Sequence, residues 1–134
     1  GREDVMPKTA IHTPEVPDFR APTSLAIRSG NLLFISGMAA HDRDGKTVGV
    51  GDAEAQTRQA LDNLKALVEA AGGTLADVVK LTVFVRNIAD RPKVNKVRAE
   101  YFREPYPSAT LAEVTGLAGP DWLVEIEAIA VLAS

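Results

Sequence analysis

Apolar and polar residues follow two different periods along the chain, and the longest apolar segment lies near its C-terminal end. Residues 122–132 are apolar except for Glu125 and Glu127. Their content of Ile and Val, and the Gly119-Pro120-Asp121 turn before them, predict a strand that is buried on both faces. Side chains two residues apart share one face of a strand, so both glutamates should point the same way.

Five further segments have the β-branched and apolar content of strands. They are residues 8–12, 24–28, 31–36, 78–86 and 109–115. The Pro-rich residues 13–22 should form a loop, because proline lacks the backbone donor that a sheet requires. Ser29-Gly30 should form the turn of a hairpin.

A helical period appears in two places. Between residues 57 and 71, apolar residues recur every three or four positions, which predicts an amphipathic helix. Asp52 is suited to cap the N-terminus of this helix, and Gly72-Gly73 is suited to end it. A second helix should begin at Asp90-Arg91-Pro92, since proline is accepted in the first helical turn.

Together these elements predict one α+β domain over residues 1–134, with a mixed sheet of about six strands and two helices packed on one face. Two helices can cover only one face of such a sheet. We therefore expect the other face to pack against copies of the same chain.

Composition narrows the classes of protein to consider. A length of 134 residues, 46% of them hydrophobic, fits one globular domain, and the net charge of -3 lacks the basic excess that nucleic acid binding requires. The chain has no cysteine, which excludes disulfides and is typical of a reducing compartment.

The sequence shows no membrane-spanning run or leader, so we expect a cytoplasmic protein. His12 and His41 have no partner at ligand spacing, and we interpret both as structural rather than as metal ligands.

The two glutamates of the C-terminal strand are the first candidates for chemistry. A buried carboxylate is costly unless it is paired or hydrogen-bonded, so the fold must either supply partners or use the charge. Two structural interpretations stay open beside a catalytic one. Glu125 and Glu127 could pair with Lys or Arg at a subunit interface, or face solvent at a sheet edge.

Six blocks of sequence carry a resemblance to a known family. They are residues 56–66, 77–85, Val94-Asn95, Tyr101-Phe102, Pro105-Tyr106-Pro107 and 124–130. In this order they resemble the RidA (YjgF) family of reactive-intermediate deaminases. The resemblance implies a chorismate-mutase-like subunit and a homotrimer with three pockets between subunits. It also implies hydrolysis of enamines and imines, such as 2-aminoacrylate, to a 2-oxo acid and ammonia without cofactor or metal.

The resemblance also implies which residues form the site. Glu125 matches the glutamate that holds the attacking water and is the candidate catalytic residue. The candidate substrate-binding residues are Thr23, Ser36, Gly37, Met38, Asn95, Arg98, Ala109, Thr110 and Leu111. Within this set, Ser36, Gly37 and Asn95 match the family. Thr23 and Met38 replace its usual tyrosine and glutamine.

One departure bears directly on the substrate. Ala109 stands where the deaminating branch of the family has an arginine that binds the substrate carboxylate. Loss of such a charge-assisted pair costs about 2–5 kcal/mol, so we expect inefficient deamination of 2-aminoacrylate. Arg98, one turn after Asn95, replaces a common aromatic residue, and its guanidinium could reach the vacated place or lie in solvent.

Two other functions compete with deamination. The scaffold could serve a non-catalytic trimer that binds small molecules or acts as a chaperone. Ribonuclease activity, sometimes claimed for the family, is disfavoured by the acidic charge balance and by the lack of an acid and base histidine pair.

Overall fold

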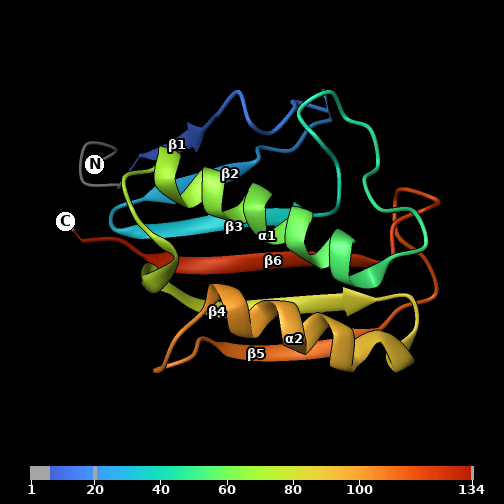
Figure 1. Ribbon diagram of the computed structural model, residues 1–134. Coiled ribbons are helices and arrows are strands. Elements are labelled where there is room, and N and C mark those ends of the chain that lie inside the picture. Colours follow the sequence, from blue (N-terminus) through green and yellow to red (C-terminus); the bar gives the residue numbers. More distant parts are fainter. Residues whose placement is uncertain (1–6, 20, 134) are drawn as a thin grey trace.

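A mixed β-sheet and two helices form two layers in the computed structural model, which describes residues 7–19 and 21–133 (Figure 1). The strands are β1 Lys8–Ile11, β2 Ala26–Ser29, β3 Leu32–Met38, β4 Val78–Val85, β5 Ser108–Glu113 and β6 Val124–Val131. The helices are α1 Ala53–Ala70 and α2 Arg91–Tyr101, with short 3-10 helices η2 Leu75–Asp77 and η3 Ile88–Asp90. The predicted α+β fold, with six strands and two helices, is confirmed.

The last strand along the chain lies in the middle of the sheet. The order is β1-β2-β3-β6-β4-β5, and every neighbouring pair is antiparallel except β4 and β5. A parallel pair requires a crossover connection, which α2 supplies. Glu125 and Glu127 are therefore carried by a central strand and not by a sheet edge.

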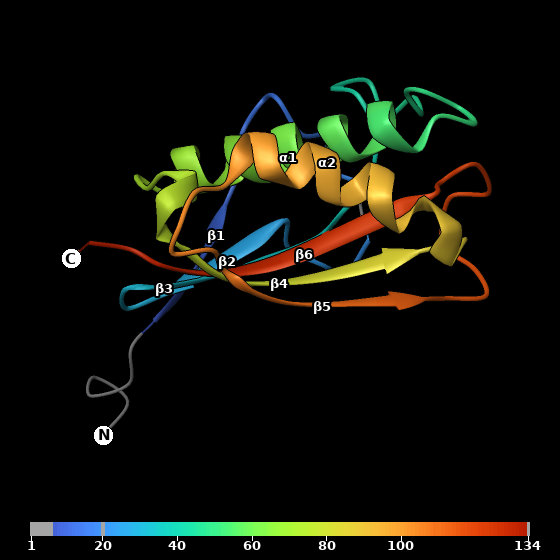
Figure 2. The same ribbon diagram turned by 60° about the horizontal axis from the view of Figure 1, so that its bottom comes forward.

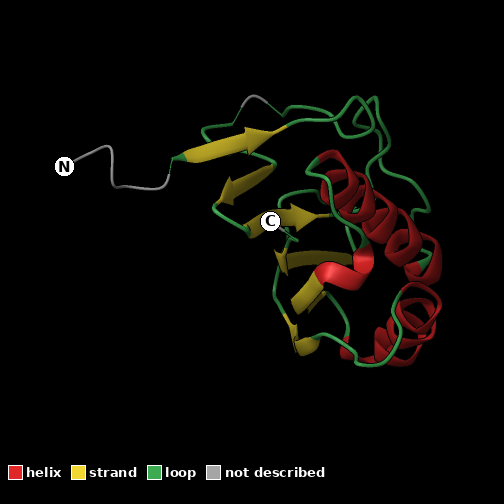
Figure 3. Cartoon of the chain, turned by 90° about the vertical axis from the view of Figure 1, so that its left-hand side faces the viewer, coloured by secondary structure: helices red, strands yellow, loops and turns green. Residues whose placement is uncertain are grey.

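Both helices cover the same face of the sheet (Figures 2 and 3). Leu81, Val83 and Ile126 point into this layer and are fully buried. Along β6, buried residues alternate with residues that are half-buried or exposed, and Glu127 is exposed. The prediction that this strand is buried on both faces is wrong for the single chain, because no element of the described chain covers the second face.

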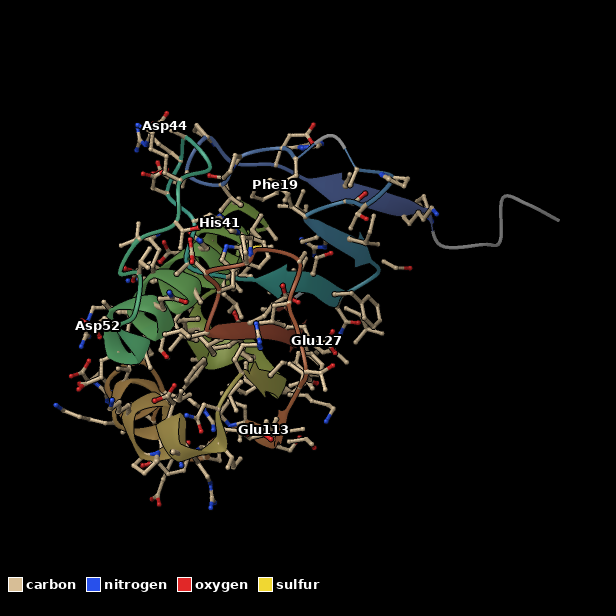
Figure 4. All side chains as sticks on the ribbon, turned by 90° about the vertical axis from the view of Figure 1, so that its right-hand side faces the viewer. Phe19, His41, Asp44, Asp52, Glu113 and Glu127 are labelled. Atoms are coloured by element: carbon tan, nitrogen blue, oxygen red, sulfur yellow. The ribbon has the colours of Figure 1, made fainter. Side chains whose placement is uncertain are left out.

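We call this uncovered side of the sheet the open face. It carries several large apolar side chains, of which Phe34 is 44% exposed and Leu32 and Val131 are each 39% exposed. The register places Phe34 opposite Ile129 and Leu32 opposite Val131, so these side chains form a continuous patch. Figure 4 shows Glu127 on the same side of the sheet, away from the helices.

The ends of α1 are where the sequence predicts them. The side chain of Asp52 caps the helix by accepting a hydrogen bond from the backbone N–H of Ala55 at 3.0 Å. After the helix, Gly72 has a φ of +91°, a conformation that favours glycine.

A buried glutamine of α1 holds the chain where it enters β6. The Nε2 of Gln56 donates to the backbone oxygens of Gly49 at 3.2 Å and Asp121 at 2.9 Å, and its Oε1 accepts from the N–H of Leu123 at 2.8 Å. Because these bonds are shielded from water, they fix the loop before β6 and with it the position of Glu125.

His41 lies in the loop that follows β3, packed against α1 and the N-terminal loop (Figure 4). Its ring contacts Phe19 edge to face, with centroids 4.8 Å apart. The Nδ2 of Asn63 lies 3.3 Å from Nδ1 of His41 and donates to its backbone oxygen at 2.9 Å. These contacts support the structural interpretation of His41. Burial lowers the pKa of its imidazole.

Within the described ranges, no helix is both long and apolar enough to cross a membrane.

Candidate functional site

The residues that the sequence assigns to one site fall into two groups on opposite faces of the sheet. Ser36, Gly37 and Glu125 lie where β3 and β6 meet, whereas Ala109 lies on β5 beneath α2. Strands β5 and β6 are separated by β4, a spacing of about 10 Å. Ala109 pairs with the buried Leu81 and so faces the helices, while Glu125 faces the open side. One chain therefore does not bring the two groups together.

The Glu125 carboxylate lies directly over the backbone of Gly37. A Cβ atom built at Gly37 would be 2.6 Å from Oε2 of Glu125 and 2.8 Å from its Cδ. The pairing of β3 with β6 shifts register between Ile35 and Met38, so Ser36 and Gly37 lie in a bulge. Bulges of this kind often occur beside active sites, where they redirect a side chain.

The environment of Glu125 makes its carboxylate a stronger proton acceptor than an exposed glutamate. Burial raises the pKa of this carboxyl group above its ordinary value, and the negative charge of Glu127 raises it further. A half-buried carboxyl group with a raised pKa is suited to transferring protons.

Ser36 makes two bonds to the segment that leads into β2. Its Oγ donates to the backbone oxygen of Ser24 at 2.6 Å, and its N–H donates to the oxygen of Leu25 at 2.9 Å. The hydroxyl proton is thus engaged within the fold, and only the oxygen lone pairs stay free for a ligand.

The second group surrounds a cavity between α2 and β5. Its volume is about 380 Å³, and it is lined by Ile88, Arg91, Asn95, Arg98, Ala109 and Leu111. An adjoining cavity of about 350 Å³ shares Asn95 and Arg98 and extends towards Phe102 and Tyr106. Ala109 has a short side chain, so the space under the helix stays open.

Arg98 belongs to this cavity and is only partly exposed to solvent. Its Nη1 donates to Oδ1 of Asn95 at 3.0 Å. Burial lowers the pKa of its guanidinium, and the neighbouring Arg91 lowers it further. Arg91 is absent from the sequence-derived set, although its position four residues before Asn95 places both on one stripe of the helix.

The other expected site residues lie apart from this cavity. Met38 is 2% exposed and belongs to the core beneath the helices. Thr110 is exposed on β5, on the face opposite Ala109, and Thr23 is exposed in the loop before β2.

Comparison with known proteins agrees with the fold. A family model described as Endoribonuclease L-PSP matches residues 13–132. The chain belongs to this family, the RidA (YjgF) family. A Rid family protein from Yersinia pestis has the same fold, with a TM-score of 0.89, 38% sequence identity and coverage of 94% of this chain and 100% of that one. The subunit thus has the chorismate-mutase-like fold that the resemblance implies.

Curated relatives in the RidA family span nearly the whole chain. A RutC family protein of Pyrococcus horikoshii is 46% identical over 92% of this chain and 97% of its own length. The 3-aminoacrylate deaminase RutC of Acinetobacter baylyi is 41% identical over 93% and 98%. A 2-iminobutanoate/2-iminopropanoate deaminase of Dermatophagoides farinae is 36% identical over 96% and 99%. The family and these relatives support RidA-type deamination of imines or enamines.

Proposed function

We propose that this chain is a homotrimeric hydrolase that deaminates a small imine or enamine in a pocket between two chains. The observation that supports this proposal is the separation of the site residues, with Glu125 on the open face and Asn95 and Ala109 beneath α2. Residues on opposite faces of one sheet can share a pocket only if a second chain brings its own group to the first.

The open face supplies a reason for such an assembly. Leu32, Phe34 and Val131 expose an apolar patch that water solvates poorly. Covering the patch with another copy removes this cost and also encloses Glu125 further. The resemblance to RidA proteins favours three copies arranged in a closed ring.

In the proposed reaction, water attacks the carbon of a protonated C=N bond. The carbon gains an oxygen and loses its nitrogen, so that an iminium ion and water give a carbonyl compound and an ammonium ion. Glu125 orients the water and accepts its proton, a role that its raised pKa favours. Asn95 and the backbone around Thr110 donate hydrogen bonds that polarise the substrate, and the Ser36 oxygen accepts a hydrogen bond from its nitrogen.

Ala109 sets the limits of this activity. An arginine at this position would bind a carboxylate with paired hydrogen bonds, and alanine offers none. A loss of about 3 kcal/mol corresponds to roughly a hundredfold in rate. We therefore propose that this chain deaminates 2-aminoacrylate more slowly than arginine-bearing relatives do.

A second candidate function is a trimer that binds a small molecule without chemistry. The engagement of the Ser36 hydroxyl with Ser24 favours this alternative, because it removes one donor from the pocket. The same assembly and the same pocket would serve it.

A pair of glutamine variants tests the proposed function. Glu125→Gln should lower the rate of imine hydrolysis at least a hundredfold while light scattering still shows a trimer, since the amide is nearly isosteric. Glu127→Gln is the matched control, because it removes an exposed charge from the same face two residues away. Its maximal rate should stay within a few-fold of the wild-type rate, while its pH profile should shift to lower pH, because the charge that helps to raise the pKa of Glu125 is gone.

Three results would count against the proposal. Full activity of Glu125→Gln would exclude Glu125 as the group that activates water. Inactivity of the wild-type trimer on every imine tested would favour the binding alternative. A stable folded monomer at micromolar concentration would exclude a pocket shared between chains.

A further inference from the structure

Three polar side chains of α2 line one wall of the cavity above β5. Arg91, Asn95 and Arg98 follow each other at spacings of four and three residues, which places them on one stripe of the helix. Ala109 and Leu111 are the β5 residues that line the cavity. Two guanidinium groups thus border a space of about 380 Å³ in which the strand contributes no polar side chain.

The two guanidinium groups have no carboxylate partner among residues 7–19 and 21–133. The ion pairs of this part of the chain join other residues, and Arg98 bonds only to the neutral oxygen of Asn95. Glu113, further along β5, accepts a hydrogen bond from the backbone N–H of Ile88 at 2.9 Å. The residues that line the cavity therefore carry two positive charges and no negative charge, and Glu113 is engaged beside it.

Helix stability gives no reason for this arrangement. Arg91 is the first residue of α2; Asp90 precedes it as the N-cap without a side-chain capping bond and pairs with Lys93, and the first turn contains no acidic residue. A cation at the N-terminus of a helix opposes the helix dipole and costs stability. Repulsion between Arg91 and Arg98 adds to that cost, as does the partial burial of Arg98. A bound anion would offset all three effects.

We propose that Arg91 and Arg98, together with the amide of Asn95, select a dianionic substrate, an imino or enamino dicarboxylic acid. This inference rests on the deaminase function proposed above and names its substrate class. A monocarboxylate would neutralise one guanidinium and leave the other unpaired, whereas a dicarboxylate can pair with both. Ala109 leaves the space that the longer molecule requires. The reaction is unchanged: an iminium dicarboxylate and water give a 2-oxo dicarboxylate and an ammonium ion.

Binding of the 2-oxo products tests the charge preference without requiring catalysis. Isothermal titration calorimetry on the assembled protein compares 2-oxoglutarate, a dianion, with 2-oxobutanoate, a monoanion. Wild type should bind 2-oxoglutarate at least tenfold more tightly. Arg91→Gln and Arg98→Gln should each remove most of this difference, because each deletes one charge-assisted contact.

Lys93→Gln is the matched control. Lys93 lies on the same helix and carries the same charge, but it lines neither cavity and forms an ion pair with Asp90 at 3.8 Å. Its affinity for 2-oxoglutarate should stay within twofold of wild type. Circular dichroism and thermal unfolding establish that each variant is folded before its titration is interpreted.

A kinetic comparison separates this inference from the function on which it rests. Imines generated in situ from glutamate and from 2-aminobutyrate by amino-acid oxidases are supplied to wild type and to both arginine variants. Faster hydrolysis of the glutamate imine, lost in the variants, supports both proposals. Equal rates on both imines, unchanged in the variants, would overturn the dianion site and leave the deaminase intact. A charge preference in binding without any hydrolysis would overturn the deaminase and leave the anion site.

Discussion

Substitution of Gly37 by alanine should separate the placement of the catalytic acid from the stability of the fold. The added Cβ would lie 2.6 Å from Oε2 of Glu125, 2.8 Å from Cδ and 3.0 Å from Cγ. Ordinary non-bonded contacts begin near 3.4 Å, so the carboxylate must move by roughly 0.8 Å. The obstacle is the end of a flexible side chain, and the backbone of Gly37 does not have the positive φ that excludes alanine.

These two facts set the expected magnitudes. A rotation of Glu125 away from its preferred rotamer costs about 0.5–1.5 kcal/mol, so the variant should stay folded with a modestly lower Tm. A reacting group misplaced by about 1 Å can lose roughly a hundredfold in rate. The rate of imine hydrolysis should therefore fall far more than the stability.

Initial rates of 2-oxo acid release and thermal unfolding curves, measured on the same samples, check both expectations. Gly116→Ala is the matched control, because a Cβ there meets no atom within 4 Å and should change neither quantity. Wild-type activity in Gly37→Ala would refute the reasoning, since it would show that the observed position of Glu125 is not the one that activates water. A loss of cooperative unfolding would show that Gly37 serves the fold and not the site.

Two further predictions concern Ala109 and His41. Ala109→Arg should raise the rate of 2-aminoacrylate hydrolysis towards that of arginine-bearing relatives, because the guanidinium can bind the substrate carboxylate. The same variant should hydrolyse the glutamate imine more slowly than wild type, because the arginine side chain fills the cavity. Equal rates for wild type and variant on both substrates would contradict this prediction. Burial lowers the pKa of His41 in the folded state, whereas in the unfolded chain this histidine keeps its ordinary pKa near 6.5. Below that pH the unfolded chain binds more protons than the folded chain, so stability should fall as the pH drops through 6.5. Thermal unfolding at several pH values checks this, and the His41→Asn variant, which keeps an acceptor for Asn63, should lack that part of the pH dependence.

The sequence by itself determines most of the local structure. The helix from Ala53 to Ala70 is predictable because its period, its Asp52 cap and its glycine stop are properties of neighbouring residues. The strands are predictable for the same reason, although β2 begins at Ala26 and so is shorter than expected. The order of the family blocks also identifies the RidA fold. The single-domain extent, the homotrimer and the cytoplasmic location stay predictions.

Only the tertiary structure decides which elements pack together and which face of each strand is covered. Strand order places β6 in the centre of the sheet, and the bulge in β3 brings Gly37 under Glu125. The packing of α2 on the sheet places Arg91 and Arg98 above Ala109. A strand rich in Ile and Val has the same composition whether a helix or a second chain covers it. The sequence of β6 therefore predicted burial on both faces, although one face is open in the single chain. Likewise, the sequence predicts one pocket for the matched site residues. In the structure, Glu125 and Ala109 lie on opposite sides of the sheet, because neighbouring side chains of a strand point in opposite directions.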